Sequence, residues 1–411
     1  MKLRCLGDFV ELRQGLAINK GSAHLVSDIQ DISYCYPLLR IADMMDSNFS
    51  KFVSKDVSSS VIANPQDIIY TRTGQIGLAF RGMQGVVHNN SFIVSLKTDE
   101  LEKDYLYTVL NSNFVKKQAN SQAKNSVQPD LTHTMFKSMV IPVPDSKKEQ
   151  NGISKIINNI NQKIQINNQI NQELESMAKT LYDYWFVQFD FPDQNGNPYK
   201  SSGGKMVYNL ELKREIPEGW GVEKIENIAQ TGSGGTPKST NVSYYSNGEI
   251  PWINSGELEQ TVITSTSNFI TEEGLNNSSA KLFPSGTILV AMYGATAGKV
   301  SFLTFEASTN QAICAITLTD IRMRYYLKNV IEDLYQYLVK LSTGSARDNL
   351  SQDMIKNIKV VIPSNDILDR FYDFSNNIIK EITKKQQENE QLTQLREWLL
   401  PMLMNGQVKV E

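Results

Sequence analysis

Two glycine-rich stretches contain residue types that could bind phosphate. Gly294, Gly298 and Lys299 resemble a nucleotide-binding phosphate loop, but only three residues separate the glycines where the motif needs four. Val300 stands where the motif needs Ser or Thr, and VSFLTF (300–305) predicts a strand where it needs a helix. GSGG (232–235) lacks the G-x-G-x-x-G spacing of a dinucleotide site. Neither stretch fits its motif, so we expect no nucleotide-binding site at either one.

Side chains for catalysis or metal binding are also missing at useful spacings. The chain has no H-E-x-x-H, no G-x-S-x-G and no N/D-P-P-Y/F loop of adenine methyltransferases. Its three histidines and three cysteines are scattered, without a C-x-x-C pair. We therefore expect no catalytic residues, no metal site and no cofactor bound by this chain.

Composition indicates a globular, cytoplasmic protein. The 411 residues are 40% hydrophobic and 21% charged, with a net charge of −3. No run of about 20 apolar residues could cross a membrane, and the charged N-terminus differs from a signal peptide. The small net charge neither supports nor excludes nucleic-acid binding, because local patches make such contacts.

The sequence repeats itself once, with residues 1–189 matching 220–411 at an offset of about 219. Seven blocks recur in the same order. They include YPLLRIADM (36–44) with IPWINSGEL (250–258), HNNSFIVSL (88–96) with TNQAICAITL (309–318), and MFKSMVIPVP (135–144) with MIKNIKVVIP (354–363). Short apolar runs before each helix predict strands, and hence a mixed α/β globule in each repeat.

Each repeat ends in a predicted coiled-coil helix. Seam positions alternate by four and three residues from 153 to 185 and from 371 to 403, with polar residues in mid-seam: Asn167, Asn171, Lys385 and Asn389. A misassigned helix is the alternative. A helix over 153–185 would be about 50 Å long. Half-sites on one face of DNA lie about 34–36 Å apart or multiples of that, so these dimensions suit a protein that reads two separated DNA segments. The apolar ends YDYWF (182–186) and WLLPMLM (398–404) are expected to pack on the globule of the other repeat, or alternatively on a partner subunit.

The predicted fold class is α+β. Two mixed α/β globules are joined by two long antiparallel coiled-coil helices, with an internal pseudo-twofold repeat. The predicted boundaries are a first globule at 1–150, a central helical region at 151–189, a linker at 190–219, a second globule at 220–365 and a C-terminal helical region at 366–411.

The stretch FDFP…GNPYKSSGGKM…IPEGW (189–220), followed by GGTPK (234–238) and IPWINSGEL, resembles the specificity (S) subunits of type I restriction–modification systems over essentially the whole chain. The resemblance implies a non-catalytic subunit that binds double-stranded DNA at an asymmetric bipartite target. It also implies two methylation subunits on the helices and restriction subunits joined through the complex. S-adenosylmethionine, Mg and ATP would be bound by those partners. The first repeat departs from the pattern, with GLAINKGS (15–22) in place of the GGTPK form.

DNA contacts in the first globule are expected on loops. Arg72 and Gln75 are predicted to read base edges, and Thr73 to contact phosphate. Asn89 and Asn90 would read adenine or cap the turn. The basic candidates for phosphate contact, or alternatively for a solvated face, are Lys20, Lys116, Lys117 and Lys124.

The second globule offers matching candidates. Its loop holds Tyr293 and Thr296 ahead of Lys299, with packing as the alternative for Tyr293. Asn310 and Gln311 are predicted to occupy the positions of Asn89 and Asn90. Lys238 is expected on phosphate, and Arg347 either on DNA or paired with Asp348.

The outward helix faces are expected to dock the methylation subunits, with a solvated surface as the alternative. These faces carry Lys155, Lys163, Glu173, Lys179, Lys380, Lys384, Glu388 and Glu390. Two other classes of function remain open at this point: a coiled-coil adaptor without a DNA role, and the recognition part of a fused restriction–methylation enzyme.

Overall fold

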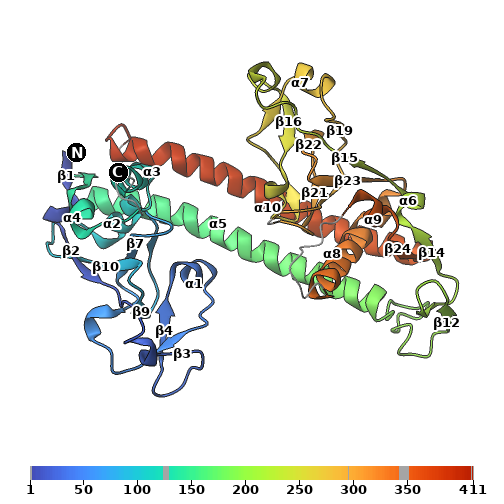
Figure 1. Ribbon diagram of the computed structural model, residues 1–411, viewed down its shortest axis with the longest axis horizontal. Helices are drawn as coiled ribbons and strands as arrows, with labels where there is room; N and C mark the ends of the chain where they lie inside the picture. Colours follow the sequence, from blue (N-terminus) through green and yellow to red (C-terminus); the bar gives the residue numbers. More distant parts are fainter. Residues whose placement is uncertain (1, 124–128, 295, 342–350, 409, 411) are drawn as a thin grey trace. The chain divides into compact units, whose positions relative to one another are not determined.

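The computed structural model describes residues 2–123, 129–294, 296–341, 351–408 and 410, and divides into two compact units (Figure 1). The first unit comprises Met1–Ile164 with Gln391–Glu411, and the second comprises Gln165–Glu390. Each unit therefore contains one globule and a segment of each long helix. Among the described residues, no helix combines the length and the apolar character needed to cross a membrane.

The globule of the first unit is built on two small sheets. Strand order is β2-β10-β7-β8 in one sheet and β3-β5-β4-β9-β6 in the other, while β1 pairs with β11. The strands are β1 (Lys2–Cys5), β2 (Val10–Gln14), β3 (Val26–Ser27), β4 (Tyr36–Leu39), β5 (Phe52–Val53), β6 (Ile62–Ala63), β7 (Ile68–Thr71), β8 (Ala79–Phe80), β9 (Gly85–Val87), β10 (Ser91–Leu96) and β11 (Val140–Val143). Its helices are α1 (Ile41–Asp46), α2 (Lys103–Leu110), α3 (Asn113–Ala123) and α4 (His133–Ser138).

The globule of the second unit repeats this topology, except that its first sheet has one more strand (β17) and its other sheet one strand fewer, with no described counterpart of β3. Strand order is β15-β23-β20-β21-β17 in one sheet and β18-β16-β22-β19 in the other, while β14 pairs with β24. The strands are β14 (Gly221–Lys224), β15 (Ala229–Ser233), β16 (Ile250–Ile253), β17 (Val262–Ile263), β18 (Phe269–Ile270), β19 (Leu282–Phe283), β20 (Ile288–Ala291), β21 (Val300–Leu303), β22 (Ala307–Thr309), β23 (Ile313–Leu318) and β24 (Lys359–Ile362). Its helices are α6 (Ile225–Ile228), α7 (Glu272–Asn276), α8 (Arg324–Leu341) and α9 (Gln352–Lys356).

Strand register confirms the predicted repeat. β4 runs parallel to β9, and β16 runs parallel to β22 in the same way. The N-caps of α4 and α9 also match, because the hydroxyls of Thr132 and Ser351 accept hydrogen bonds from the backbone N–H groups of Met135 and Met354 (3.2 and 3.1 Å).

One loop alignment within the repeat was wrong by one residue. Val87 lies opposite Leu39, and Thr309 lies opposite Ile253. Asn310 and Gln311 therefore correspond to His88 and Asn89, and not to Asn89 and Asn90. The sequence alignment had matched the asparagines of the two loops, whereas the pairing of the strands fixes the true register.

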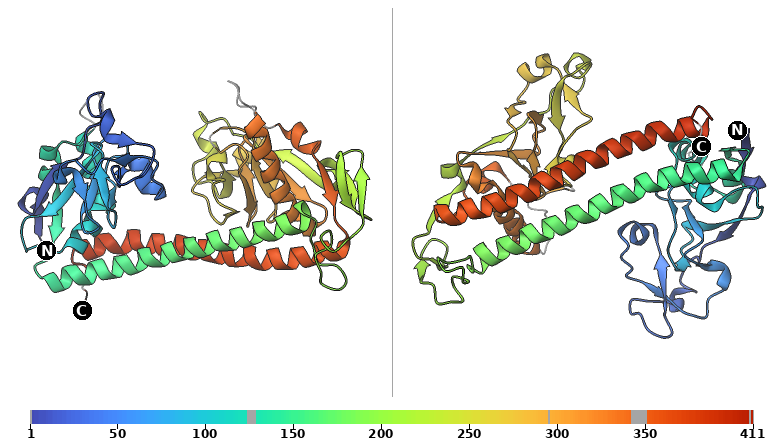
Figure 2. Two further views of the ribbon diagram at one scale, coloured as in Figure 1. Left: turned by 90° about the horizontal axis from the view of Figure 1, so that it is seen from below. Right: turned by 180° about the vertical axis from the view of Figure 1, so that it is seen from behind.

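The two predicted helices are α5 (Lys147–Tyr182) and α10 (Asn365–Met404), which lie side by side and antiparallel within each unit (Figures 1 and 2). The predicted seam is confirmed, since each of its positions on both helices is buried or half-buried and none is exposed. Asn167 is fully buried, and its amide donates to Glu388 Oε2 and Asn389 Oδ1, both at 2.9 Å. The amide of Asn389 donates in turn to Asn168 Oδ1 (2.7 Å). A buried polar layer of this kind favours one register over others.

The apolar helix ends complete the cores of the globules, as predicted. Leu400, Leu403 and Met404 of α10 are buried in the main core of the first unit. Trp185 and Phe186, in a turn of π-helix (Asp183–Val187) that continues α5, are buried in the main core of the second. Each globule is therefore closed by the helix of the other repeat.

The segment predicted as a linker (190–219) contains structure of its own. It forms the hairpin β12 (Met206–Asn209) and β13 (Arg214–Pro217). Phe191 stacks between Tyr199 and Trp220, with ring centroids 4.7 and 4.8 Å away. These aromatic contacts attach the segment to the core of the second unit.

Candidate nucleic-acid interface

Backbone hydrogen bonds join the loops that follow β7 and β9 in the first unit. The N–H groups of Arg72 and Thr73 both donate to the carbonyl of Asn90 (2.8 and 3.3 Å), and the N–H of Leu131 donates to the carbonyl of Arg72 (3.0 Å). The structure therefore brings the predicted residues Arg72, Thr73 and Asn90 together. In the second unit the N–H of Met292 donates to the carbonyl of Ala312 (2.8 Å), which makes Met292 the counterpart of Arg72.

Arg72 is held by a carboxylate that the sequence analysis did not identify. Its Nε and Nη2 atoms donate to the two carboxylate oxygens of Asp130 (2.9 and 2.5 Å). Both side chains are half-buried. A guanidinium has five N–H donors, so this two-point contact fixes its plane and leaves other donors for a ligand.

The turn at 88–90 is capped by His88. Its Nδ1 accepts a hydrogen bond from the backbone N–H of Asn90 (3.3 Å), so Asn89 and Asn90 are not the capping side chains. Burial lowers the pKa of His88, and the nearby Arg40 guanidinium lowers it further. A neutral imidazole is the form that can accept this hydrogen bond.

Arg40 and Asn254 occupy corresponding positions that the sequence analysis missed. Each is the first residue after the paired strands β4 and β16. The Arg40 guanidinium donates to both carboxylate oxygens of Asp43 (2.5 and 2.9 Å), and Asn254 Oδ1 accepts from the Asn310 amide (3.4 Å). The signal was available, since both are the fifth residue of the aligned blocks YPLLR and IPWIN.

The other predicted residues of the first unit are surface groups. Gln75 is exposed on the loop after β7, and Lys20 and Lys117 are also exposed. Within the described ranges, neither lysine has a carboxylate at ion-pair distance. Lys124 lies outside the described residues.

Two predicted residues of the second unit contribute to its packing. Tyr293 is half-buried against the main core, which is the alternative that the sequence left open. The Thr296 side chain is 8% exposed and its hydroxyl donates to the carbonyl of Ser255 (2.8 Å).

Asn310, a third predicted residue, caps its own turn, because its Oδ1 accepts a hydrogen bond from the N–H of Ala312 (3.1 Å).

The GGTPK turn holds Lys238 next to the loop that carries Gln311. The Thr236 hydroxyl donates to Gln311 Oε1. A Cβ at Gly234 would lie 2.0 Å from the carbonyl oxygen of Thr309, so only glycine allows this approach. Lys238, Lys299 and Gln311 are exposed and suited to contact a ligand. Arg347 lies outside the described residues.

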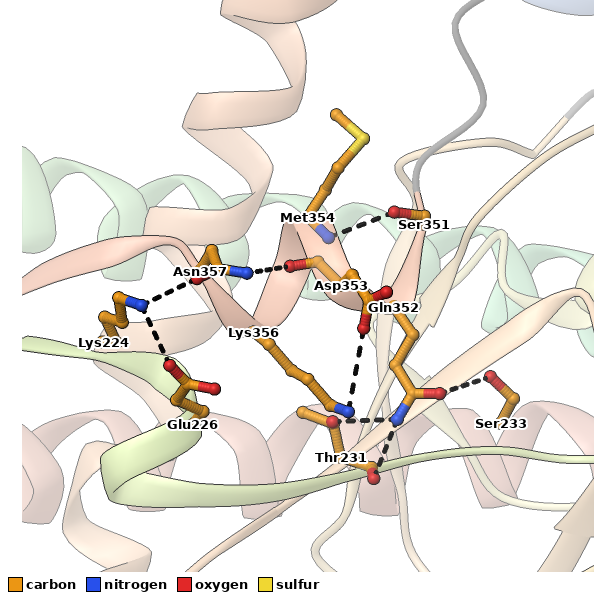
Figure 3. A network of polar contacts seen from close by, with 10 residues as sticks. All are labelled: Lys224, Glu226, Thr231, Ser233, Ser351, Gln352, Asp353, Met354, Lys356 and Asn357. Atoms are coloured by element: carbon orange, nitrogen blue, oxygen red, sulfur yellow. Dashed lines mark hydrogen bonds and ion pairs between the residues drawn. The ribbon is translucent and has the colours of Figure 1, made fainter.

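Gln352 attaches β15, the strand that leads into this turn, to α9 (Figure 3). Its amide nitrogen donates to the carbonyl and hydroxyl of Thr231, both at 3.0 Å, and its carbonyl oxygen accepts from Ser233 (3.1 Å). At the other end of α9, Lys224 donates to Asn357 Oδ1 (2.8 Å). These contacts place the start of the turn on a rigid support.

The helix faces predicted to dock partners are only partly exposed. Lys155, Glu173, Lys380 and Lys384 are exposed. Lys179 pairs with Asp183, Glu388 accepts from Asn167, and Glu390 accepts from Thr264. In the described ranges, no group of three or more His, Cys, Asp or Glu side chains is arranged to hold a metal ion.

Comparisons with known proteins agree with this arrangement. The family model described as "Type I restriction modification DNA specificity domain" matches residues 1–176 and again 217–394. The specificity subunit of the type I restriction enzyme MjaIX from Methanocaldococcus jannaschii is 25% identical over 84% of this chain and 78% of its own length. The HindI specificity subunit from Haemophilus influenzae is 25% identical over 79% and 81%.

A solved structure shares the fold. The crystal structure of a type I restriction–modification S subunit from M. genitalium superposes with a TM-score of 0.58 at 14% identity, covering 98% of this chain and 95% of that one. The two family matches coincide with the two halves of the repeat. The chain therefore belongs to the type I restriction–modification DNA specificity family.

Proposed function

We propose that this chain is the DNA-recognition and scaffold subunit of a type I restriction–modification complex. Each globule reads one half of an asymmetric bipartite target in double-stranded DNA. The chain performs no chemistry itself. Two methylation subunits, which bind S-adenosylmethionine, dock on the helices, and restriction subunits that use Mg and ATP join through the complex.

The observation that carries this proposal is that matching loops of the two globules share their backbone arrangement but differ in their side chains. Arg72 corresponds to Met292, and His88 corresponds to Asn310. Their backbone N–H groups bond in the same way, to Asn90 and Ala312 in the first case and to Leu39 and Ile253 in the second. Base edges are distinguished by the donors and acceptors that a protein presents. Two globules with the same loop backbone but different side chains are thus suited to two different half-sites. A coiled-coil adaptor without a DNA role would not need different side chains on these loops.

Phosphate contacts are the natural role of the unpaired lysines. Lys20, Lys117, Lys238 and Lys299 are exposed, and in the described part of the chain none of them has a carboxylate at ion-pair distance. Contacts of lysine with phosphate position a protein on DNA without reading its sequence. Gln75, on the loop after β7, and Gln311, on the loop between β22 and β23, are exposed and are proposed to contact bases.

A genome-wide map of methylated adenine tests the proposal. Cells expressing the methylation subunit are compared with and without this chain. We expect a bipartite motif that is methylated only when the chain is present. Exchange of residues 220–363 for another recognition domain should change one half of the motif only. A change in both halves would rule out one half-site per globule.

A further inference from the structure

A pocket of about 640 Å³ lies in the first unit, away from the loops described above. Its walls come from the end of α2, from α3, and from the two long helices α5 and α10. A volume of this size lies within the range of ligand and peptide sites, about 300–1,000 Å³. Polar groups on its walls include Asn111, Asn158, Asn161 and Asn405, whose amides can both donate to and accept from a peptide backbone.

Lys116 and Arg396 are half-buried cations in the wall of this pocket, which Lys2 and Glu397 also line. Burial lowers the pKa of Lys116, and the positive charge of Arg396 lowers it further, against a smaller opposite effect of Glu397. The Arg396 guanidinium donates to Asn161 Oδ1 (2.8 Å). Within the described residues, no carboxylate lies at ion-pair distance from Lys116 or Arg396. A half-buried pair of like charges favours an incoming anion.

Two exposed aromatic side chains lie in the pocket wall or next to it on α10. Phe114, which lines the pocket, is 42% exposed. Trp398 lies one helical turn before Pro401 on the same side of α10 and is 63% exposed, whereas Trp185, Trp220 and Trp252 are each 9% exposed. An occupant with both a carboxylate and apolar side chains would cover this surface as well as the cations.

An ion pair occupies the corresponding position in the second unit. Tyr105-Leu106 and Tyr326-Leu327 are the same buried pair of residues 221 positions apart, so Ser112 corresponds to Asp333. The seam positions of α10 match those of α5 at an offset of 218 residues, so Glu397 corresponds to Lys179. In the second unit Lys179 pairs with Asp333 at 3.1 Å, whereas their counterparts Glu397 and Ser112 line the pocket of the first unit.

We propose that the pocket receives an acidic, apolar segment of one methylation subunit, and that only one of the two docked copies is held in this way. This inference rests on the proposed function above. The two long helices are the docking element in that proposal, and both contribute to the pocket wall. The unpaired cations and the exposed Trp398 match a partner that supplies a carboxylate and apolar side chains.

The test uses the full chain with purified methylation subunit, and counts subunits per complex by mass photometry. The double variant Lys116→Glu/Arg396→Glu should retain one methylation subunit at concentrations where the unmodified chain retains two. Lys97→Glu, an exposed lysine outside the pocket, is the matched control and should retain two. Circular dichroism establishes that the variants fold, and Lys116→Gln/Arg396→Gln should show the same loss to a smaller degree.

A second readout uses Trp398. With 5-hydroxytryptophan incorporated into this chain alone, binding should protect Trp398 from acrylamide quenching, and Trp398→Phe should remove that change. The inference is wrong if the double variant retains both subunits with unchanged affinity, loses both, or if Trp398 stays equally accessible in the complex. If the unmodified chain binds no methylation subunit at all, the proposed function itself fails.

Discussion

Arg72 and Asp130 lie 58 residues apart in the chain and are joined through two hydrogen bonds of 2.9 and 2.5 Å. The contact connects the loop after β7 with the segment that leads into α4. It orients the guanidinium that we propose reads DNA, so Asp130 acts on recognition through Arg72.

Loss of this carboxylate should weaken both stability and recognition. We expect Asp130→Asn to lower the free energy of unfolding by about 1 kcal/mol, because the pair is half-buried and screened by solvent. Methylation should become less selective at one half-site only. Urea denaturation and methylated-base mapping measure the two effects. Asp28→Asn, whose side chain is 73% exposed in its pair with Lys51, is the control and should alter neither.

His88 should make the first globule sensitive to pH. Its pKa is lowered in the folded protein from the ordinary 6.5, so the unfolded chain binds the proton more readily. Its contribution to stability is present above pH 6.5 and is lost as the pH falls through the lowered pKa. His88→Asn introduces the residue that occupies the corresponding position 310 in the second unit. It should flatten the decline in the free energy of unfolding between about pH 7 and pH 5. An unchanged profile of unfolding free energy would contradict this role.

Lys238 and Gln311 should affect DNA binding in different ways. Lys238→Ala is expected to weaken binding to all sequences equally and to reduce the salt dependence of log K by about 0.9. Gln311→Ala should instead relax one base position while leaving the salt dependence as it was. Fluorescence anisotropy over a salt series separates the two. Lys200→Ala, an exposed lysine of the 190–219 segment, is expected to match the unmodified chain.

Leu403 should be essential to the first unit although it belongs to the second repeat. It is fully buried in the core of the first unit, so Leu403→Ala should cost about 2–5 kcal/mol of stability. Hydrogen exchange should increase across β1 and α2 and remain slow in β20 and β23. Leu395→Ala, on the same helix but 43% exposed, should cost under about 0.5 kcal/mol. Equal effects of the two variants would argue against this packing.

The helices and the repeat could be predicted because they depend on local periodicity. Ile160 and Ile378 fall on a regular seam, and burial of that seam determines how the helices pair. β7 and β10 were visible as continuous apolar runs because consecutive residues of both strands are buried. These features involve neighbours in the sequence.

The candidate site depended on contacts that are distant in the sequence. Nothing near Arg72 indicates its pairing with Asp130, and the one-residue error at Asn310 arose because both loops contain asparagine. The hairpin β12–β13 was missed because the Gly, Pro, Asn and Ser residues of the surrounding segment 190–219 are typical of a linker. There, packing of Phe191 on Trp220 outweighs local preference.

The exchange of helix ends between the repeats has a consequence for biosynthesis. Leu400, Leu403 and Met404 follow the entire second globule in the chain, yet they complete the core of the first. A ribosome therefore makes the first globule long before it makes the residues that close that core. Contacts of such long sequence separation form slowly. During translation the nascent first globule is therefore expected to expose an apolar surface to chaperones until the second globule and α10 have been made.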